Sequence, residues 1–309
     1  MTGPPEERDV VIVGGGAAGF TAAIYLGRAA LQPLLLEGQV TGGQAAMAGI
    51  VENFPGFPDG IAGPDLGAAM EAQARKWGTE IRAAFVDRLE AGRGAHLLYT
   101  AQQVIRARAV VIATGASHRR LGVPGEQELS GRGVSYCATC DGPLYRDRRV
   151  VVVGGGDAAV EEALYLARLA SQVTVIHRRG QLRAVQILQQ RAFAEKKISF
   201  LWDHAVTRIL GSEEVSGVRI SNVRTREEGE LPTEGVFVYI GTTPNTRFLP
   251  AEVATDEGGF IKTDLLMRTS VAGIFAAGDV RFASVRQLIA AAGDGAIAAD
   301  SATKYLQNA

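Results

Sequence analysis

The stretch that decides the fold is Val10-Val11-Ile12-Val13-Gly14-Gly15-Gly16-Ala17-Ala18-Gly19, which is followed by a helical pattern from Phe20 to Ala30. A short apolar run of this kind is typical of a buried strand. The glycines after it permit a tight turn, and the amino terminus of the following helix can bind a pyrophosphate group. The order of strand, glycine turn and helix therefore predicts a dinucleotide-binding unit of the Rossmann type.

A second apolar run, Leu34-Leu35-Leu36, ends at Glu37, 18 residues after Gly19 and close to the distance typical of the ribose-binding acid. A carboxylate there can hold the hydroxyls of a ribose that carries no 2′-phosphate, as in FAD or NAD. An ordinary surface glutamate at the end of a strand is the alternative. The residues predicted to contact this first dinucleotide are Gly14, Gly16, Ala17, Ala18, Gly19 and Glu37.

The same pattern occurs a second time. Arg149-Val150-Val151-Val152-Val153 leads into Gly154-Gly155-Gly156-Asp157-Ala158-Ala159, and a helical pattern follows from Val160 to Leu169. Two units in which strand and helix are both intact predict an α/β protein with two Rossmann-like domains and two dinucleotide sites. The residues predicted to contact the second dinucleotide include Gly154, Gly156, Asp157, Ala158 and Ala159.

The second unit differs from the first where the ribose is recognised. Its second strand, 173–176, is followed by His177-Arg178-Arg179, and Arg183 lies four residues further on. Basic groups at this position form charge-assisted hydrogen bonds with a 2′-phosphate, which an acidic residue would repel. The pattern predicts NADPH rather than NADH, and a solvated basic loop is the alternative.

The only two cysteines, Cys137 and Cys140, lie between the two units. A disulfide over so short a loop constrains little chain entropy, so this spacing favours electron transfer over stabilisation. The spacing also occurs in zinc sites, but a structural zinc site needs four ligands, and the sequence has no second cysteine pair and no matching histidine pair. A redox dithiol without a metal is the leading interpretation, and two inert thiols are the alternative.

Asp141 directly follows this pair and could act as general acid toward a leaving thiolate, although Asp141-Gly142 also suits a simple turn. A chain with a dithiol and an NADPH site gains little from a second nicotinamide. Hydride transfer from a nicotinamide and thiolate attack on a disulfide are different reactions. A flavin accepts hydride and can reduce a disulfide, so it can connect the two. The first dinucleotide is therefore predicted to be FAD.

Composition limits the remaining possibilities. The chain has 309 residues, 47% of them hydrophobic, and a formal net charge of −1, which predicts two ordinary domains and gives no basic field for nucleic acid. The amino terminus lacks the pattern of a signal peptide, and no apolar run approaches the length of a membrane span. We expect a soluble protein of the cytoplasm. The reducing environment of that compartment keeps a cysteine pair available as a working dithiol.

Four motifs together resemble the bacterial low-molecular-weight thioredoxin reductases over essentially the whole chain. They are Cys-Ala-Thr-Cys-Asp-Gly at 137–142, Gly-Gly-Gly-Asp-Ala-Ala-Val-Glu-Glu-Ala at 154–163, His-Arg-Arg at 177–179 and Ala-Ala-Gly-Asp-Val at 276–280. The resemblance implies a homodimeric NADPH-dependent flavoprotein that passes electrons from NADPH through FAD to the Cys137–Cys140 disulfide and on to thioredoxin.

The resemblance also implies a discontinuous FAD domain, 1–116 with 246–309, and an inserted NADPH domain, 117–245, that rotates during turnover. Cys140 would receive electrons from the flavin, Cys137 would attack the disulfide of the partner, and Asp141 would donate the proton. Without the resemblance, Asp279 and Gln287 are more simply a turn residue and a helix-starting residue. The further FAD contacts that it implies are Gly42, Gly43, Gln44, Asn53, Thr114, Gly115, Gly278, Asp279, Arg286 and Gln287.

Two stretches depart from the family pattern. Pro143-Leu144 replaces two bulky aromatic residues that help to bind thioredoxin, which leaves the protein partner open. In the glycine-rich loop 40–63, which we expect to be functional, the small residues at 45–48 replace threonines near the flavin. The alternatives are a flavin disulfide reductase for another dithiol carrier, a dithiol oxidase, and a non-catalytic redox sensor; the arginines argue against the oxidase.

Overall fold

The computed structural model describes residues 4–38, 41–47 and 50–308. The chain divides into two compact units, and the first of them, Met1–Ser117 with Thr243–Ala309, combines the beginning and the end of the chain. The second unit is the continuous segment His118–Thr242. The passages between the units lie in β9 (Ala116–His118) and β18 (Thr242–Pro244), two short strands that pair with each other.

The first unit is built on a seven-stranded sheet with the order β5-β2-β1-β8-β7-β6, in which β19 also pairs with β8. Strand β1 is parallel to both β2 and β8, and its last four residues are buried. The strands of this sheet are β1 (Glu6–Val13), β2 (Leu34–Glu37), β5 (Glu80–Ala83), β6 (Val86–Glu90), β7 (His96–Thr100), β8 (Val104–Ile112) and β19 (Ile274–Ala276). The other elements of the unit are η1 (Gly43–Met47), β3 (Ile50–Val51), β4 (Ile61–Ala62), η3 (Gly278–Val280), α1 (Ala17–Arg28), α2 (Gly63–Lys76) and α6 (Leu288–Asn308).

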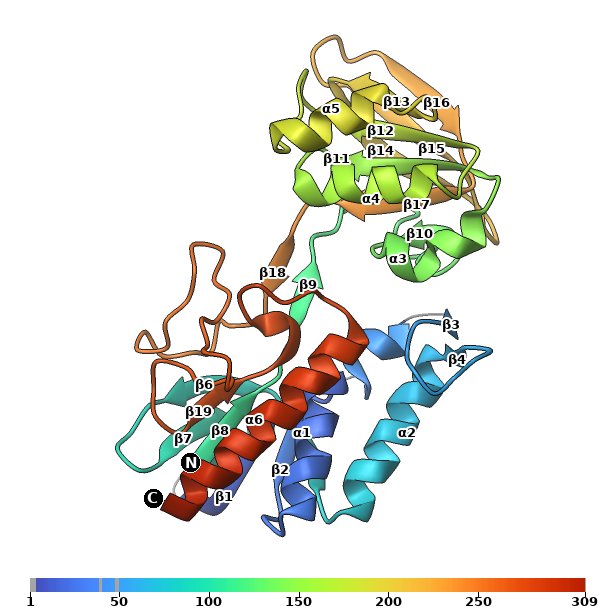
Figure 1. Ribbon diagram of the computed structural model, residues 1–309. Coiled ribbons are helices and arrows are strands. Elements are labelled where there is room, and N and C mark those ends of the chain that lie inside the picture. Colours follow the sequence, from blue (N-terminus) through green and yellow to red (C-terminus); the bar gives the residue numbers. More distant parts are fainter. Residues whose placement is uncertain (1–3, 39–40, 48–49, 309) are drawn as a thin grey trace. The chain divides into compact units, whose positions relative to one another are not determined.

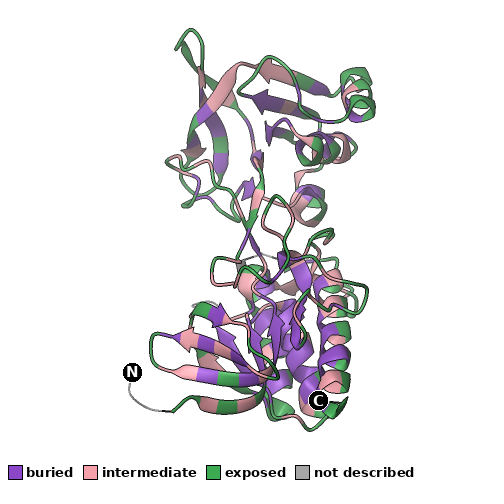
Figure 2. Ribbon diagram, turned by 90° about the vertical axis from the view of Figure 1, so that its left-hand side faces the viewer, coloured by how far each residue is buried: buried purple, intermediate pink, exposed green. Residues whose placement is uncertain are grey.

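Three helices lie side by side in this unit, with α1 between α2 and α6 (Figure 1). Helices α1 and α6 approach each other closely because small residues face the contact: a Cβ atom on Gly295 would collide with the carbonyl of Ala18. Buried side chains from the helices and from β1 and β8 form one core, and Figure 2 shows the buried residues gathered in the sheet and on the inner helix faces. This core fixes the glycine turn between β1 and α1.

The second unit contains a five-stranded parallel sheet with the order β10-β17-β11-β12-β13 and a three-stranded antiparallel sheet, β14-β15-β16. Its strands are β10 (Val134–Ser135), β11 (Arg149–Gly154), β12 (Gln172–His177), β13 (Ile198–Trp202), β14 (His204–Gly211), β15 (Val215–Asn222), β16 (Glu228–Pro232) and β17 (Gly235–Tyr239). Its helices are α3 (Ala138–Asp141), η2 (Gly142–Tyr145), α4 (Asp157–Ala167) and α5 (Gln186–Ala194).

Both helices that follow the glycine turns begin three residues earlier than the sequence pattern predicts. Helix α1 begins at Ala17 and α4 at Asp157, after Gly16 and Gly156, whose backbones are extended. The last residues of each glycine motif therefore already form the first turn of the helix. Helix α1 also ends at Arg28, because Ala30 has a positive φ of 60° that interrupts the helix.

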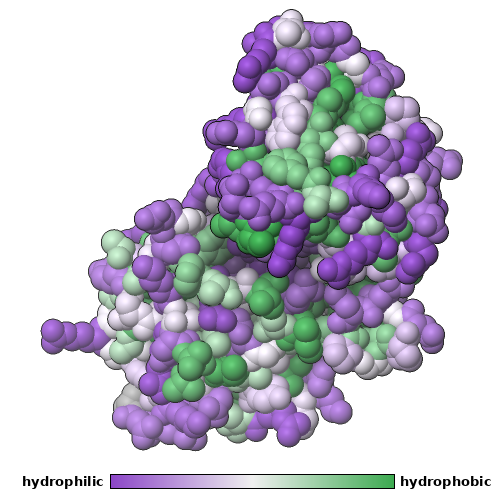
Figure 3. All heavy atoms as spheres, turned by 45° about the horizontal axis from the view of Figure 1, so that its top comes forward, coloured by the Kyte–Doolittle hydropathy of each residue, from purple (hydrophilic) through white to green (hydrophobic). Residues whose placement is uncertain are grey.

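The surface is mixed in character. Figure 3 shows hydrophobic residues on the visible face as patches among hydrophilic ones. None of the helices in the described part of the chain combines the length and the apolar character that crossing a bilayer requires.

Candidate active site

The cysteine pair forms a disulfide at the start of the one-turn helix α3. The Sγ atoms of Cys137 and Cys140 are bonded, and their Cα atoms lie 5.3 Å apart. Cys137 is the N-cap residue, and its Sγ accepts the backbone N–H of Cys140 at 3.2 Å. Residues 4–38, 41–47 and 50–308 contain no group of three His, Cys, Asp or Glu side chains that could hold a metal ion. The pair is thus a disulfide with a hydrogen-bond donor already directed at the sulfur of Cys137.

Asp141 lies at the other end of α3, where it is half-buried. Its Oδ2 accepts the hydroxyl of Ser135 at 2.6 Å, and the Ser135 oxygen in turn accepts the backbone N–H of Cys137 at 3.1 Å. Burial raises the pKa of Asp141 above its ordinary value of 3.8, and the Ser135 hydrogen bond opposes this shift. Ser135 links the acid to the cysteine, a role that the sequence motif does not reveal because the residue precedes it on β10.

The glycine turn of the second unit lies between β11 and α4. A loop from β12 is fastened to it: the backbone N–H of Arg183 donates to the carbonyl of Gly155 at 2.7 Å, and that of Val185 donates to Asp157 Oδ1 at 2.7 Å. The loop carries Arg178, Arg179 and Arg183, all of them exposed, and none forms an ion pair with any residue that the structure describes. Three unpaired cations therefore stand beside the turn, as a 2′-phosphate requires.

His177 differs from these arginines. Its ring is buried against the turn, since a Cβ atom on Gly155 would collide with the imidazole, and its Nε2 has no hydrogen-bond partner among the described residues. Burial lowers the pKa of His177 below its ordinary value of 6.5, and Arg183 and Arg179 lower it further. The exposed positive charges of this loop are therefore those of the arginines, whereas the surroundings of His177 disfavour its charged form.

Glu37 holds the equivalent position in the first unit. It ends β2 and packs against the second glycine of the first turn, because a Cβ atom on Gly15 would meet its carboxylate. One carboxylate oxygen accepts the hydroxyl of Thr41 at 3.0 Å, and the other, Oε2, is buried without a partner among the described residues. Burial raises the pKa of Glu37. An unpaired buried carboxylate oxygen is costly, so the position fits a ligand that donates hydroxyl groups, as a ribose does.

The glycine turn of this unit needs a residue without a side chain at Gly14. Its φ of +113° is unfavourable for other residues, and a Cβ atom there would collide with the carbonyl of Ala113 at the end of β8. The residues that follow, Gly16, Ala17, Ala18 and Gly19, run from the turn into the first turn of α1. The predicted order of strand, glycine turn and helix is therefore present, and in the second unit the residues Gly154, Gly156, Asp157, Ala158 and Ala159 follow the same course.

The loop after β2 returns to the glycine turn. The backbone N–H of Gly42 donates to the carbonyl of Gly15 at 2.9 Å, Gly43 begins η1, and the amide of Gln44 donates to the carbonyl of Ala116. Residues 40, 48 and 49 of this loop lie outside the described residues. The return of the loop brings the predicted loop residues to the same end of the sheet as the turn.

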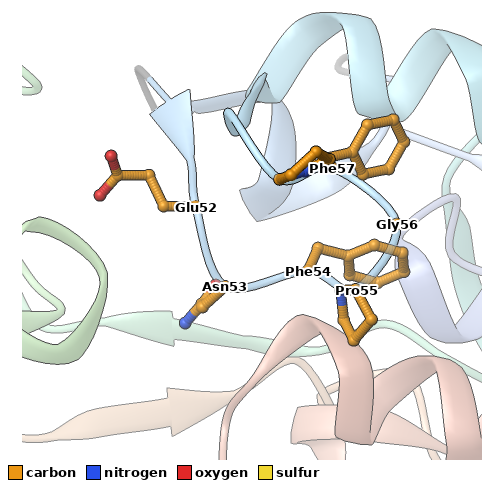
Figure 4. A pocket seen from close by; sticks show the side chains of 7 residues that line it. Glu52, Asn53, Phe54, Pro55, Gly56 and Phe57 are labelled. Atoms are coloured by element: carbon orange, nitrogen blue, oxygen red, sulfur yellow. The ribbon is translucent and has the colours of Figure 1, made fainter.

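Asn53 lies further along this loop, where a pocket is lined by residues 52–58. Figure 4 shows the rings of Phe54 and Phe57 on one side of the loop and the carboxylate of Glu52 pointing away from them. The Asn53 amide donates to Gln287 Oε1 at 3.1 Å. Two predicted site residues from opposite ends of the chain therefore meet.

The last predicted residues lie on segments from the middle and the end of the chain. The carbonyl of Thr114 accepts the Asn245 side-chain amide at 2.8 Å, and the carbonyl of Gly115 accepts the Asn245 backbone N–H at 3.1 Å. Gly278 packs against Ala18 of α1, so the segment that ends in Asp279 lies beside the first helix. Residues 114–115 are thus bonded to Asn245, and the segment around Gly278 is packed against α1.

Asp279 is itself half-buried in this segment. Its Oδ1 accepts the hydroxyl of Ser284 at 2.9 Å, and burial raises its pKa. Arg286 has a positive φ of 52°, and its guanidinium lies 5.3 Å from the ring centre of Phe260. Asp279 and Arg286 therefore both belong to the folded segment that precedes α6.

Sequence reasoning missed the ion pair that holds this segment in place. Arg281 and Asp294 lie 2.8 Å apart, and their side chains are only 15% and 13% exposed. Asp294 Oδ2 also accepts the backbone N–H of Gly278 at 3.0 Å. Both residues belong to the final part of the chain, but no motif marks them as partners.

Comparison with known proteins extends over both units. Residues 8–295 match the pyridine nucleotide-disulphide oxidoreductase family. A thioredoxin reductase of Listeria innocua is 48% identical over 300 residues, which are 97% of this chain and 94% of the relative. One of Bacillus subtilis is 47% identical over 97% of this chain and 95% of the relative. The crystal structure of a thioredoxin reductase from Streptococcus pyogenes has a TM-score of 0.94 at 45% identity and covers 99% of this chain and 100% of that one.

Proposed function

The chain belongs to the thioredoxin reductases of the pyridine nucleotide-disulphide oxidoreductase family, and from this premise we propose that it reduces the disulfide of thioredoxin with electrons from NADPH and with FAD as its flavin. The observation that carries the proposal is the Cys137–Cys140 disulfide, on the same unit as a glycine turn flanked by three arginines that form no ion pair with any described residue. The disulfide supplies the thiol chemistry, and the arginines supply the preference for a phosphorylated nucleotide.

The first unit fits FAD. The turn at Gly14 lets a pyrophosphate approach the amino terminus of α1, and the unpaired oxygen of Glu37 suits the ribose hydroxyls. Asn53, Gln287 and Asp279 would bind the rest of the molecule. When bound, FAD supplies a ring system that accepts hydride from NADPH and reduces a disulfide.

The second unit fits NADPH. Arg178, Arg179 and Arg183 would bind the 2′-phosphate, and the turn at Gly154–Gly156 would bind the pyrophosphate. His177 would pack against the nucleotide as a neutral ring, because its burial disfavours the charged form.

The cysteines would carry out thiol exchange with thioredoxin. After reduction, the Cys137 thiolate attacks one sulfur of the thioredoxin disulfide, forms a mixed disulfide and releases the other thioredoxin sulfur as a thiolate. Cys140 then attacks the Cys137 sulfur, which restores the disulfide and frees dithiol thioredoxin. Asp141, whose raised pKa keeps it protonated to higher pH, would donate a proton to a departing thiolate.

The surface beside the disulfide is where thioredoxin would bind. Pro143 and Leu144 follow α3 in η2, and Leu144 is 55% exposed. An exposed leucine can take part in an apolar contact with the partner. Its apolar surface is smaller than that of the two aromatic side chains in the family pattern. We propose thioredoxin as the partner, a homodimer as the assembly and the cytoplasm as the location, in keeping with the bacterial relatives and with a dithiol that needs a reducing compartment.

The test is anaerobic reduction of the purified protein by NADPH, followed by addition of thioredoxin from the same source and a thiol count. We expect the flavin absorbance to fall with NADPH, to return with thioredoxin, and new thiols to form on thioredoxin. Cys137→Ser and Cys140→Ser are the controls, and each should keep a flavin that NADPH reduces while losing thioredoxin reduction.

Three other outcomes would contradict the proposal. Transfer to a different dithiol protein alone would identify another carrier, and return of the flavin absorbance only with oxygen would identify an oxidase. Slow flavin reduction without any disulfide turnover would indicate a sensor.

A further inference from the structure

Tyr239 connects two parts of the second unit that the motifs treat separately. It is the last residue of β17 and pairs with Gly154, the first glycine of the turn after β11. A Cβ atom on Gly154 would collide with the carbonyl of Tyr239, so the backbone of Tyr239 lies directly against the glycine turn. Its side chain reaches from there to the helix that carries the disulfide.

The Tyr239 hydroxyl oxygen accepts the backbone N–H of Ala138 at 2.5 Å. Ala138 is completely buried and is the first residue of α3, so its N–H has no acceptor within the helix. A helix of one turn has no cooperative stability of its own, and its position depends on contacts such as this one. Tyr239 thus fixes α3 at the residue that follows Cys137.

Two carboxylates influence the hydroxyl, Glu162 from α4 and Asp141 from α3. Burial raises the pKa of Tyr239, and the charges of Glu162 and Asp141 raise it further, so the residue remains a neutral phenol. Glu162 Oε2 is itself buried without a partner in the part of the chain that the structure describes. The accepting oxygen of Tyr239 therefore has a stable protonation state throughout the working pH range.

We propose that Tyr239 is a positioning residue of the dithiol: by holding the Ala138 N–H, it keeps α3 where the Cys140 N–H can stabilise the Cys137 thiolate. The inference deepens the proposed function, on which it rests for the role of the dithiol in turnover. In the structure the Cys140 N–H lies 3.2 Å from Cys137 Sγ. Loss of the Tyr239 oxygen would leave a buried N–H without an acceptor, and α3 would shift away from this arrangement.

The variant that tests the proposal is Tyr239→Phe, which removes the oxygen and keeps the ring. The protein is reduced with dithiothreitol, and the rate at which iodoacetamide alkylates Cys137 is followed against pH by peptide mass spectrometry. We expect the midpoint of alkylation to move to higher pH, because the thiolate loses its donor. We also expect thioredoxin reduction to slow about tenfold, with the KM for NADPH unchanged.

The matched control is Tyr145→Phe. Tyr145 is another tyrosine of the same unit, it lies in η2 directly after α3, and it packs edge-on against Phe237 at 5.2 Å between ring centres. The Tyr145→Phe variant should leave the pH profile of Cys137 alkylation unchanged. A wild-type profile in Tyr239→Phe, or an equal shift in both variants, would overturn the proposal.

A second measurement separates anchoring from general loss of stability. Thermal unfolding is followed for the wild-type protein, Tyr239→Phe and Tyr145→Phe, and the alkylation profiles are compared at a temperature at which all three are folded. We expect the shift of Tyr239→Phe to persist there, because it comes from the lost acceptor of the Ala138 N–H and not from unfolding. A shift that disappears when the folded fractions are equal would show that Tyr239 only stabilises the unit.

The alkylation experiment needs neither NADPH nor thioredoxin. If the wild-type protein fails to reduce thioredoxin, the proposed function fails, whereas the alkylation profiles still decide the role of Tyr239.

Discussion

Glu37 and His177 occupy equivalent residue positions in the two units, each at the end of the second strand and each packed against the second glycine of its turn. Each also has a buried polar atom without a partner among the described residues. A carboxylate at this point accepts ribose hydroxyls and repels a phosphate. An uncharged imidazole accompanied by arginines allows a phosphate to bind at the corresponding point. A single position thus separates the two nucleotide preferences that we propose.

The first prediction concerns Arg178. Replacement by alanine should weaken NADPH binding by about 1.5–3 kcal/mol, the value of a charge-assisted hydrogen bond, and leave NADH binding nearly unchanged. The measurement is kcat/KM with each nucleotide. Arg208→Ala, which removes an exposed arginine from β14, is the control and should affect neither. An equal loss with both nucleotides would contradict the phosphate role.

Asp141 gives a prediction on pH. Because burial raises its pKa, the protonated acid persists to higher pH, and the rate of disulfide reduction should fall as pH rises through that raised pKa. Asp141→Asn should slow thioredoxin reduction about 100-fold, as loss of a general acid does, and should abolish this dependence. Single-turnover rates measured across the pH range provide the test. The general-acid role would be excluded by a variant that keeps the wild-type pH profile.

At the scale of the elements, the first unit depends on contacts between its amino-terminal and carboxy-terminal parts. Helices α1 and α6 pack through small residues, and the segment η3 is fastened to α6 by Asp294. Arg281 completes this connection through its ion pair with Asp294. The position of the proposed flavin contact at Asp279 is therefore supported by a part-buried ion pair.

Arg281→Ala should leave Asp294 without its counter-charge and lower the free energy of unfolding by about 2–3 kcal/mol, less than the loss of a fully buried pair because both side chains keep some contact with water. It should also weaken flavin retention, because η3 loses its support. Thermal unfolding and the ratio of flavin to protein absorbance would show both effects. As a control, Arg106→Ala removes an exposed ion pair with Glu7 in the same unit and should cost less than about 1 kcal/mol. Equal losses in the two variants would refute the role of the buried pair.

At the scale of the whole molecule, the disulfide and the NADPH-type turn share one unit, and the residues assigned to FAD belong to the other. In the function that we propose, both sites on the second unit must reach the same flavin during one cycle. The chain passes between the units only twice, through β9 and β18, so rotation about these two passages is a physically simple solution.

We therefore expect that an engineered disulfide joining the two units stops thioredoxin reduction. The measurement is steady-state turnover of the oxidised, locked protein, and the controls are the two variants that carry only one of the added cysteines. The controls should remain active, because they keep the rotation free. Full turnover in the locked protein would rule out the rotation.

Much of the architecture could be predicted from local sequence. The strand, turn and helix around Gly14 and Gly154 depend on residues that are neighbours in the chain, and the structure confirms the α/β fold with its parallel sheets. The comparisons confirm the family that the motifs indicate. The ends of the helices were less predictable, because Ala17 and Asp157 begin helices inside the glycine motifs.

Short stretches of sequence were enough to identify the two glycine turns, the acid at Glu37, the arginines after His177 and the cysteine pair. Which distant side chains meet became clear in the three-dimensional structure: Asn53 with Gln287, Arg281 with Asp294, and Tyr239 with Ala138. The burial of His177, which lowers the pKa of its ring, also became clear there. Such pairings and burial arise from the packing of several elements at once, and no local pattern of residues encodes them.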